Sequence, residues 1–346
     1  MRQITYCEAL TEGITQEMER DESVFVYGIG APDHKKIFGT TNGLVEKFGP
    51  ERCFDTPLCE DAMTGFGLGA ALNGMRPIHI HIRVDFMLLA INQLVNMVSS
   101  FCYGSAGRLP VPFVIRVIVG RGWGQGFQHS KTLHSYFAHI PGLKVILPTT
   151  PYDAKGMIVE AIRDKNPVIC IEHRWLYWAI GDVPTESYAI PFGKAQILRE
   201  GRDLTIIATS WMAVEALKAA DILSCYGFEA EVVDPRSIAP LDTDALVASI
   251  AKTGHCLVAD NDWTFGGFSG EIVAQIAERA FSYLKKSPMR IGFAHTPCPT
   301  VRCLENEFYR NAEDIVNLVT QAFGMNAIDM SDEDFYSHER RFKGPF

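Results

Sequence analysis

The sequence predicts an α/β protein built from two doubly wound, mostly parallel sheet domains. Short apolar runs of strand length alternate with amphipathic stretches of helical length, a pattern typical of parallel strands joined by crossover helices. The alternation stops once, in a polar stretch with two prolines at 174–200, and then resumes. A chain of 346 residues with 47% hydrophobic content is long enough for two separate cores.

The first half of the chain contains the longer series of apolar runs. We expect strands at 24–28, 78–84, 111–119, 144–148 and 167–172. We expect helices at about 5–20, 60–74, 86–103, 130–139 and 152–164. A further short strand is expected just before the helix at 60, where the string FDTP forms a turn.

The second half repeats the pattern on a smaller scale. Strands are expected at 204–209, 229–234, 255–260 and 289–294, and helices at 212–225, 242–252 and 270–284. We therefore place a first domain at 1–180, a linker at 181–200 and a second domain at 201–325. Residues 326–346 have few aliphatic side chains and an acidic block before a basic one, so we expect a surface tail.

Charge and hydropathy argue against several classes of protein. The net charge of −9, without a long basic run, disfavours nucleic-acid binding, which needs clustered Lys and Arg. We find no signal segment and no run of about 18 apolar residues, so we expect a soluble cytoplasmic protein. The nine cysteines form no CxxC pair and mostly lie in apolar strings, which predicts buried thiols in a reducing compartment and no structural zinc site.

Two strings carry the candidate chemistry. The first, FDTPLCEDAMTGFGLGAAL at 54–72, runs from a strand through a Thr-Pro turn into a helix that starts near Glu60. An acid here is also favoured by the helix dipole and by unpaired backbone donors, so a purely structural role is the alternative. The second, VGRGWGQGFQHSKTLHSYFAHIPGLKVILP at 119–148, is a glycine-rich loop that contains His129 and leads into a helix.

His129 is followed by His134 and His139, at intervals of five residues. Residues five apart lie about 140° apart around a helix, so these side chains do not converge on one metal ion. A hydrogen-bonded loop histidine is the remaining alternative to a role in proton transfer. Such a role suits an imidazole, because it titrates near neutral pH.

Both strings resemble the beta subunit of the thiamine-diphosphate-dependent 2-oxo-acid dehydrogenases, the pyruvate and branched-chain type, and the resemblance runs from about Thr5 to about Phe323. It implies a thiamine-diphosphate pyrimidine-binding domain followed by a transketolase C-terminal-like domain. In that family the glutamate matching Glu60 bonds a ring nitrogen of the cofactor's aminopyrimidine, and the residue matching Leu58 packs on this ring. The histidine matching His129 lies at the mouth of the site and handles protons of the substrate or acyl intermediate.

The segment RVDFMLLAINQLVN at 83–96 is similar to the helix that follows in the family. The resemblance places Phe86 against the aminopyrimidine. An aromatic residue at helical spacing also suits a hydrophobic core, so a core position is the alternative for Phe86.

The string AIRDKNPVICIE at 161–172 is similar to a monovalent-cation site of the family. The resemblance implies that potassium is held by backbone carbonyls of Ala161, Asp164, Asn166 and Phe113. The alternative is an ordinary helix end, whose last carbonyls have no partner within the helix.

Two parts of the chain depart from the pyruvate-type pattern. His79, His81 and Arg83 alternate on one face of an expected strand, where pyruvate-type members carry apolar or acidic residues. These side chains are either partly solvated residues of an edge strand or the wall of a pocket for an anionic or hydroxylated group. Ile29 replaces a glutamate that connects two active sites in that family, so the sequence leaves open whether two sites are coupled through protons here.

One half of a thiamine-diphosphate site is missing from the sequence. The diphosphate-binding domain of such enzymes carries a GDG string, and none occurs in this chain. The resemblance therefore implies an alpha subunit that supplies the ligands of magnesium and diphosphate, in an α2β2 heterotetramer with its active sites between the subunits. A lipoyl acyltransferase is the expected further partner of the dehydrogenase type.

The string GFGLGA at 65–70 satisfies a dinucleotide-binding fingerprint, and Asp85 lies 20 residues beyond Gly65. In that fingerprint the first glycine directly follows a strand, so that a phosphate meets the helix N-terminus. Gly65 instead lies inside an expected helix. We therefore expect these glycines to allow close helix packing rather than to bind a nucleotide.

We expect the beta subunit of a thiamine-diphosphate enzyme that decarboxylates a 2-oxo acid and transfers the acyl group, active only with an alpha subunit. The first alternative is the small half of a split transketolase-like enzyme that transfers a ketol or acyl unit in a biosynthetic pathway. A non-catalytic scaffold is the alternative from another class, and the presence of both Glu60 and His129 argues against it. Arg236 and the GGF turn at 266–268 are expected to stabilise the second domain.

Overall fold

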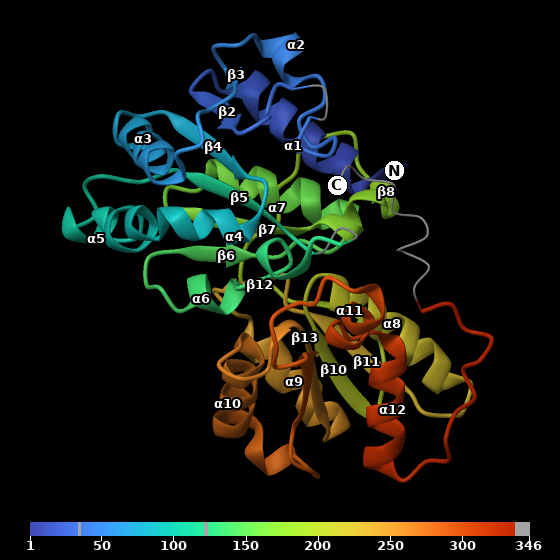
Figure 1. Ribbon diagram of the computed structural model, residues 1–346. Coiled ribbons are helices and arrows are strands. Elements are labelled where there is room, and N and C mark those ends of the chain that lie inside the picture. Colours follow the sequence, from blue (N-terminus) through green and yellow to red (C-terminus); the bar gives the residue numbers. More distant parts are fainter. Residues whose placement is uncertain (34–35, 121–123, 336–346) are drawn as a thin grey trace.

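The strands of the protein form two main sheets, one in each lobe (Figure 1). The computed structural model describes residues 1–33, 36–120 and 124–335. The first sheet has seven strands in the order β12-β6-β7-β5-β4-β2-β3, and the second has five in the order β14-β13-β10-β11-β9. Neighbouring strands are parallel except for the pairs β12–β6 and β11–β9, one in each sheet. The predicted fold class is confirmed.

The strands of the first lobe are short, apolar and mostly buried. The seven-stranded sheet comprises β2 (Val24–Gly28), β3 (Cys53–Phe54), β4 (Arg76–His81), β5 (Val114–Val119), β6 (Lys144–Ile146), β7 (Val168–His173) and β12 (Ser237–Ala239). The five-stranded sheet comprises β9 (Gln196–Arg199), β10 (Leu204–Ala208), β11 (Ala230–Asp234), β13 (Cys256–Trp263) and β14 (Met289–Phe293). A separate antiparallel pair joins β1 (Arg2–Thr5) to β8 (Ile180–Val183).

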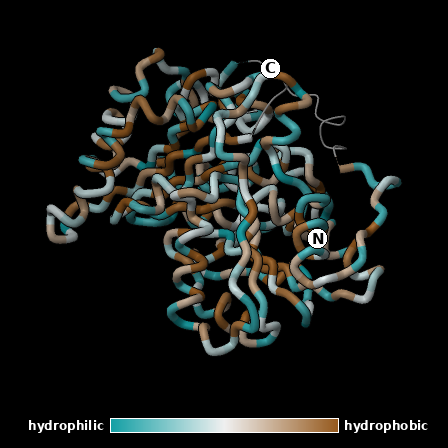
Figure 2. Tube along the Cα trace, turned by 60° about the horizontal axis from the view of Figure 1, so that its bottom comes forward, coloured by the Kyte–Doolittle hydropathy of each residue, from teal (hydrophilic) through white to brown (hydrophobic). Residues whose placement is uncertain are grey.

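Helices cover both faces of each sheet, and the hydrophobic segments run through the middle of the molecule (Figures 1 and 2). Those of the first lobe are α1 (Tyr6–Arg20), α2 (Leu44–Phe48), α3 (Glu60–Leu72), α4 (Val84–Met87), α5 (Phe101–Gly104), α6 (His134–Ala138) and α7 (Pro151–Arg163). Those of the second lobe are α8 (Trp211–Ser224), α9 (Thr243–Thr253), α10 (Phe268–Ala280), α11 (Arg302–Phe308) and α12 (Ala312–Phe323). Threonine capping boxes at Thr5 and Thr150 set the starts of α1 and α7.

The helix expected at 86–103 is broken into short pieces. Between α4 and α5 the chain forms a 3-10 turn, η1 (Leu88–Ala90), and a π-helical turn, η2 (Gln93–Val98). The two parts, Val84–Ala90 and Gln93–Gly104, meet at an angle of 65°. A π turn is a recognised cause of a sharp bend and is frequent beside functional sites. No helix in the described ranges is by itself long and apolar enough to cross a bilayer, although this bent pair passes the test jointly.

The sheet of the first lobe is completed by the second half of the chain. Strand β12 pairs with β6, and the backbone carbonyl of Arg236 accepts a 2.7 Å hydrogen bond from the Leu147 amide. The Arg236 guanidinium donates to Asp153 in α7 at 3.0 Å and to the Lys194 carbonyl at 2.7 Å. These contacts tie the two lobes together, as expected of a structural residue. Strand β9 lies in the segment 181–200 that was expected to be a linker. Of the expected tail, the structure describes 326–335.

Cysteine burial differs from the expectation at several positions. All nine cysteines lie in the described ranges and carry free thiols. Five are buried, but Cys59, Cys225 and Cys303 are exposed and Cys102 is partly exposed. Cys102, Cys225 and Cys303 lie in helices or at helix ends, outside the apolar strands. The alternation of apolar runs gives no burial signal there.

A buried ion pair lies at the centre of the first sheet. Arg116 in β5 and Glu172 in β7 are both fully buried and form two hydrogen bonds, of 2.5 and 2.8 Å. The Tyr177 hydroxyl donates a third, of 2.8 Å, to the same carboxylate. Two opposite charges in fork geometry compensate one another here, where water cannot.

We expect Glu172→Gln to lower the free energy of unfolding by about 3–5 kcal/mol, because it leaves the Arg116 guanidinium buried without a counter-charge. Tyr177→Phe is the matched control, since it keeps both charges and removes one hydrogen bond at a cost of about 1–2 kcal/mol. Urea unfolding followed by tryptophan fluorescence measures both variants. Equal losses in the two variants would contradict the expectation.

A second buried pair joins the lobes. His134 in α6 lies 3.1 Å from the carboxylate of Asp260 in β13, which also accepts a 2.7 Å hydrogen bond from Thr209. Burial by itself lowers the pKa of His134, but the Asp260 carboxylate outweighs burial and raises the pKa to about 9. His134 is therefore charged at neutral pH, and the pair contributes to the contact between the lobes.

The stabilising effect of His134 depends on pH. Its folded-state pKa lies above the ordinary value of 6.5, so the contribution is fully present below pH 6.5 and is lost as the pH rises through about 9. We expect the wild type to lose stability between about pH 7 and about pH 10, relative to His134→Gln, which lacks this ionisation. Urea midpoints at the two pH values measure the difference. The same pH dependence in both proteins would show that the ion pair is not its source.

Candidate active site

The four predicted site residues line one cavity. Leu58, Glu60, Phe86 and His129 come from three separate stretches of sequence and surround a space of about 280 Å³. The cavity lies beyond the carboxyl ends of β2 and β4, the usual place for a ligand in a parallel sheet. Its wall also includes the residues that differ from the pyruvate-type pattern, namely Ile29, His79, His81 and Arg83.

Glu60 is the first residue of α3, so it stands at the positive end of the helix dipole. The turn that leads to it is held by Asp55, whose carboxylate accepts hydrogen bonds of 2.8 Å from the amides of Gly30 and Thr56. On the rim, Leu58 is 82% exposed and Phe86 is 37% exposed. Large apolar side chains exposed around a cavity mark a surface that a ligand or a partner covers.

His129 lies against Phe86, with an edge-on ring contact at 5.2 Å between centroids. Partial burial lowers the pKa of His129, the positive charges of Arg83 and Lys131 lower it further, and Asp85 opposes them. Lys131 and Asp85 form an ion pair of 2.7 Å beside the ring. The imidazole is therefore neutral at pH 7, the form that can accept a proton.

The loop that carries His129 is fixed from the second lobe. Gly126 has φ +59°, and a Cβ atom there would lie 2.5 Å from the Thr300 hydroxyl, so this position requires glycine. The Tyr309 hydroxyl donates a 3.0 Å hydrogen bond to the Ser130 carbonyl. Contacts of this kind place the histidine through residues far away in sequence.

His79, His81 and Arg83 form the inner wall of the cavity. They are 3%, 3% and 1% exposed, and β4 lies between β2 and β5 rather than at an edge of the sheet. The edge-strand alternative is therefore wrong, and the pocket-wall alternative fits. Burial lowers the pKa of His81 to about 3, and burial together with His81 lowers that of His79. Both imidazoles are neutral, and His79 stacks on Tyr27 at 4.4 Å.

The glycines of the GFGLGA string lie inside α3, as expected. A Cβ atom on Gly67 would lie 2.1 Å from the Tyr27 hydroxyl and 2.4 Å from the Phe113 ring, so this glycine allows the helix to pack on the sheet. A Cβ atom on Gly69 would meet nothing within 4 Å, and the packing argument does not extend to it.

The carbonyls proposed for a monovalent cation lie at the end of α7 and beside it. The Asp164 carbonyl accepts a 3.1 Å hydrogen bond from Arg76, and the Phe113 carbonyl accepts one of 3.0 Å from the Val168 amide. Each carbonyl oxygen has a second lone pair, so these bonds leave room for a cation. Potassium binding at Ala161, Asp164, Asn166 and Phe113 remains a prediction.

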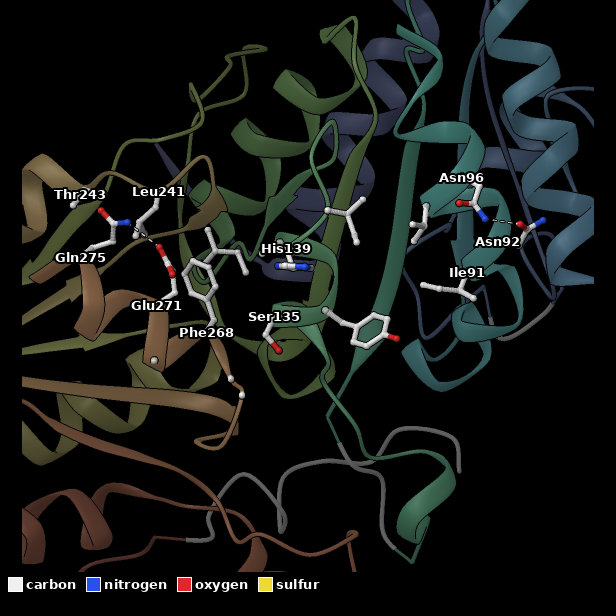
Figure 3. A pocket seen from close by; sticks show the side chains of 18 residues that line it. Ile91, Asn92, Asn96, Ser135, His139, Leu241, Thr243, Phe268, Glu271 and Gln275 are labelled. Carbon is white, nitrogen blue, oxygen red and sulfur yellow. Dashed lines mark hydrogen bonds between the residues drawn. The ribbon is translucent and has the colours of Figure 1, made fainter. Parts of the chain in front are cut away.

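A second cavity is larger than the one that the predicted residues line. It measures about 1230 Å³ and lies between η2, α6 and α10 (Figure 3). Two pairs of its polar side chains bond one another, Gln275 with Glu271 and Asn96 with Asn92, each at 2.8 Å. Size alone therefore does not identify the candidate active site.

Some residues of the smaller cavity were not found from the sequence. Phe38 and Gln125 contribute to its wall, and both lie in irregular segments without periodicity. Arg174 contacts Gln125 from behind the wall. Arg174 directly follows β7. Ligands bind beyond the carboxyl ends of parallel strands, so this position could have marked Arg174 as a residue near the site.

The fold and the cavity define the class first: a protein with the two-domain architecture of transketolases. Residues 2–178 match the family described as transketolase, pyrimidine binding domain, and residues 193–315 match transketolase, C-terminal domain. The solved structure of a split gene transketolase, an inactive beta4 tetramer, has a TM-score of 0.74 over 94% of this chain and 99% of that chain. Its sequence identity is 22%, so this likeness shows the fold alone.

Curated relatives narrow the class. The chain is 42% identical to the beta subunit of acetoin:2,6-dichlorophenolindophenol oxidoreductase of Cupriavidus necator, over 91% of this chain and 96% of that protein. It is 38% identical to the mitochondrial pyruvate dehydrogenase E1 component subunit beta of Rattus norvegicus, over 91% and 89%. The chain belongs to the family of thiamine-diphosphate-dependent 2-oxo-acid dehydrogenase beta subunits, and the predicted resemblance is confirmed.

The charges around His129 set its pKa in opposite directions, which gives a test of the geometry. We expect Asp85→Asn to lower the pKa of His129 further, because it removes a neighbouring negative charge. Lys131→Met is the matched variant, and it is expected to raise that pKa because it removes a positive charge. An NMR titration of the His129 ring protons measures both. Shifts of the same sign in the two variants would contradict this arrangement.

Proposed function

We propose that this chain is the cofactor-activating subunit of an enzyme that decarboxylates a 2-oxo acid and transfers the acyl group, with an active site completed by an alpha subunit. The observation that carries the proposal is the convergence of Leu58, Glu60, Phe86 and His129 on one cavity. Family membership supports it, because the relatives are named as beta subunits.

The cavity fits the aminopyrimidine half of thiamine diphosphate. Glu60 provides a carboxylate at a helix start, and Phe86, Leu58 and Met63 provide apolar and aromatic surface for a flat ring. When bound, the cofactor supplies a nucleophilic carbon and an electron sink for cleaving a bond next to a carbonyl. We propose that Glu60 holds and exchanges a proton at a ring nitrogen of the aminopyrimidine. Neutral His129 accepts or returns a proton of the substrate.

The proposed partner is an alpha subunit that supplies the diphosphate and magnesium ligands, in an α2β2 heterotetramer. Exposed apolar side chains around the cavity support a covering chain: Leu58 is 82% exposed, and Leu89, one turn beyond Phe86, is 63% exposed. A lipoyl acyltransferase is the proposed acceptor of the acyl group. Potassium at the end of α7 and a cytoplasmic location complete the proposal.

A split transketolase-like transferase is the second candidate. The buried polar wall of His79, His81 and Arg83 favours it, because polar side chains suit a hydroxylated or anionic substrate better than an apolar one. Glu60 and His129 would serve both reactions in the same way. The identity of the acceptor therefore decides between the two candidates.

Removal of the Glu60 carboxylate tests the proposal. The chain is co-expressed with an alpha-type subunit, and thiamine-diphosphate-dependent dye reduction is measured with a panel of 2-oxo acids and acetoin. We expect Glu60→Gln to lower kcat by about 100-fold or more, because the proton exchange at the ring is lost. Asp61→Asn, in the next residue of the same helix, is the control and is expected to keep its activity.

The proposal fails if Glu60→Gln keeps full activity, or if the chain binds thiamine diphosphate tightly and turns over substrate without an alpha subunit. Carbon–carbon bond formation on an aldehyde or sugar acceptor, with no dye reduction, would favour the transferase.

A further inference from the structure

Arg83 is a buried cation in the wall of the proposed active site. It lines the cavity and is only 1% exposed. Its guanidinium donates to the Gly120 carbonyl at 2.7 Å and to the side-chain oxygen of Gln125 at 2.6 Å. Both acceptors are neutral, so neither compensates the positive charge.

Among the residues that the structure describes, Arg83 uses only part of its hydrogen-bonding capacity. A guanidinium carries five N–H donors. The two bonds described use two of them, which leaves three for another acceptor. No carboxylate in the described ranges lies within ion-pair distance of Arg83, and the nearby Asp85 pairs with Lys131 instead. A buried cation in this state is costly unless an anion joins it.

A second buried guanidinium lies beside the first. Arg174 is fully buried and donates to the same Gln125 oxygen at 3.2 Å, and both guanidiniums face the Phe38 ring, at 4.7 Å for Arg174 and 5.8 Å for Arg83. Burial lowers the pKa of Arg83 to about 10, and burial together with Arg83 lowers that of Arg174 to about 9. Both side chains remain charged at neutral pH, so two positive charges lie close together at one side of the cavity.

The same wall carries an unused imidazole nitrogen. His81 is 3% exposed and lines the cavity, and its Nε2 atom is buried without a hydrogen-bond partner in the part of the chain that the structure describes. As a neutral imidazole it can donate one hydrogen bond from a ring nitrogen. His81 is the last residue of β4 and Arg83 follows two residues later, directly before α4, and both side chains line the same cavity.

From these groups we infer that the cavity takes a substrate with an oxyanion, a carboxylate or a phosphate, remote from its reacting carbonyl, and that Arg83 binds this oxyanion with help from His81. The inference rests on the proposed function, in which the aminopyrimidine lies against Glu60 and Leu58 and the substrate lies on the side of His129 and Arg83. Arg83 is thus assigned as a specificity-determining residue.

The carboxylate of a 2-oxo acid that departs as CO2 is a poor candidate for this contact. A buried ion pair with that group would stabilise the charged ground state and oppose its loss. An oxyanion that keeps its charge throughout the reaction gives equal binding in both states and positions the substrate without such a penalty. Arg83 therefore fits a second, retained charge of the substrate.

Matched substrates test the inference in the assembled enzyme with its alpha subunit. The carboxylate pair is 2-oxoglutarate against 2-oxopentanoate, which have the same carbon chain. The phosphate pair is xylulose 5-phosphate against xylulose. We expect the wild type to prefer the charged member of one pair in kcat/KM, and the pair that shows the preference identifies the oxyanion. Arg83→Met is expected to lower that preference about 10- to 100-fold, the size expected for a charged hydrogen bond.

Two further variants separate recognition from structure. Arg83→Lys keeps the positive charge but lacks the paired N–H donors of a guanidinium. This variant is expected to retain part of the preference for the charged substrate. Arg108→Met removes an exposed arginine that does not line the cavity, and it is expected to retain all of it. If Arg83→Met lowers kcat/KM equally for charged and uncharged members, Arg83 only holds the glycine-rich loop through Gly120, and the inference is wrong. It is also wrong if the wild type shows no preference in either pair.

A binding measurement keeps this test independent of turnover. Calorimetry with glutarate and with inorganic phosphate is carried out on the assembled, cofactor-loaded enzyme. The oxyanion site is supported if either probe binds the wild type and Arg108→Met but not Arg83→Met. This result supports the site even if no substrate in the panel reacts. In that case only the proposed reaction has failed. If neither probe binds the wild type, the oxyanion site is refuted.

Discussion

The central position of β4 in the first sheet is the constraint on which the site depends. Parallel pairing with β2 on one side and β5 on the other fixes the register of β4, and β3 pairs in parallel with β2, so all four strands end at the same edge. The segments that follow these strands must therefore leave the sheet close together. This geometry gathers a carboxylate from α3, an aromatic ring from α4 and an imidazole from the loop after β5. No single stretch of sequence contains all of them.

The protein buries two kinds of charged side chain: those that stabilise the fold and one that is available to a ligand. Arg116 with Glu172, and His134 with Asp260, are buried charges that compensate each other within the chain. Arg83 is buried as deeply, but its described partners are neutral oxygens. The difference separates charges that hold the fold from a charge that is available to a ligand, because an internally compensated pair has little affinity left for an external ion.

The sequence predicted the alternating strands and the family, because an apolar run and a motif are local signals. It also singled out four residues that the structure brings to one cavity. It did not decide whether His79, His81 and Arg83 face solvent or a pocket. That choice depends on which strands flank β4, and period-2 alternation is the same at an edge and in the interior. The break at η2 and the pairing of β12 were missed for a related reason, since both result from packing between segments distant in sequence. Phe38 and Gln125 lie in irregular loops and carried no signal at all.

The pairing of β12 with β6 has a consequence for how the protein is made. Translation proceeds from the N-terminus, and the strand that closes one edge of the first sheet lies at 237–239, well after the other six strands. The nascent first lobe must therefore wait on the ribosome with the β6 edge uncovered. An open edge is a template for pairing with another chain, so the interval before β12 emerges is the stage at which this sheet is most exposed to wrong pairing.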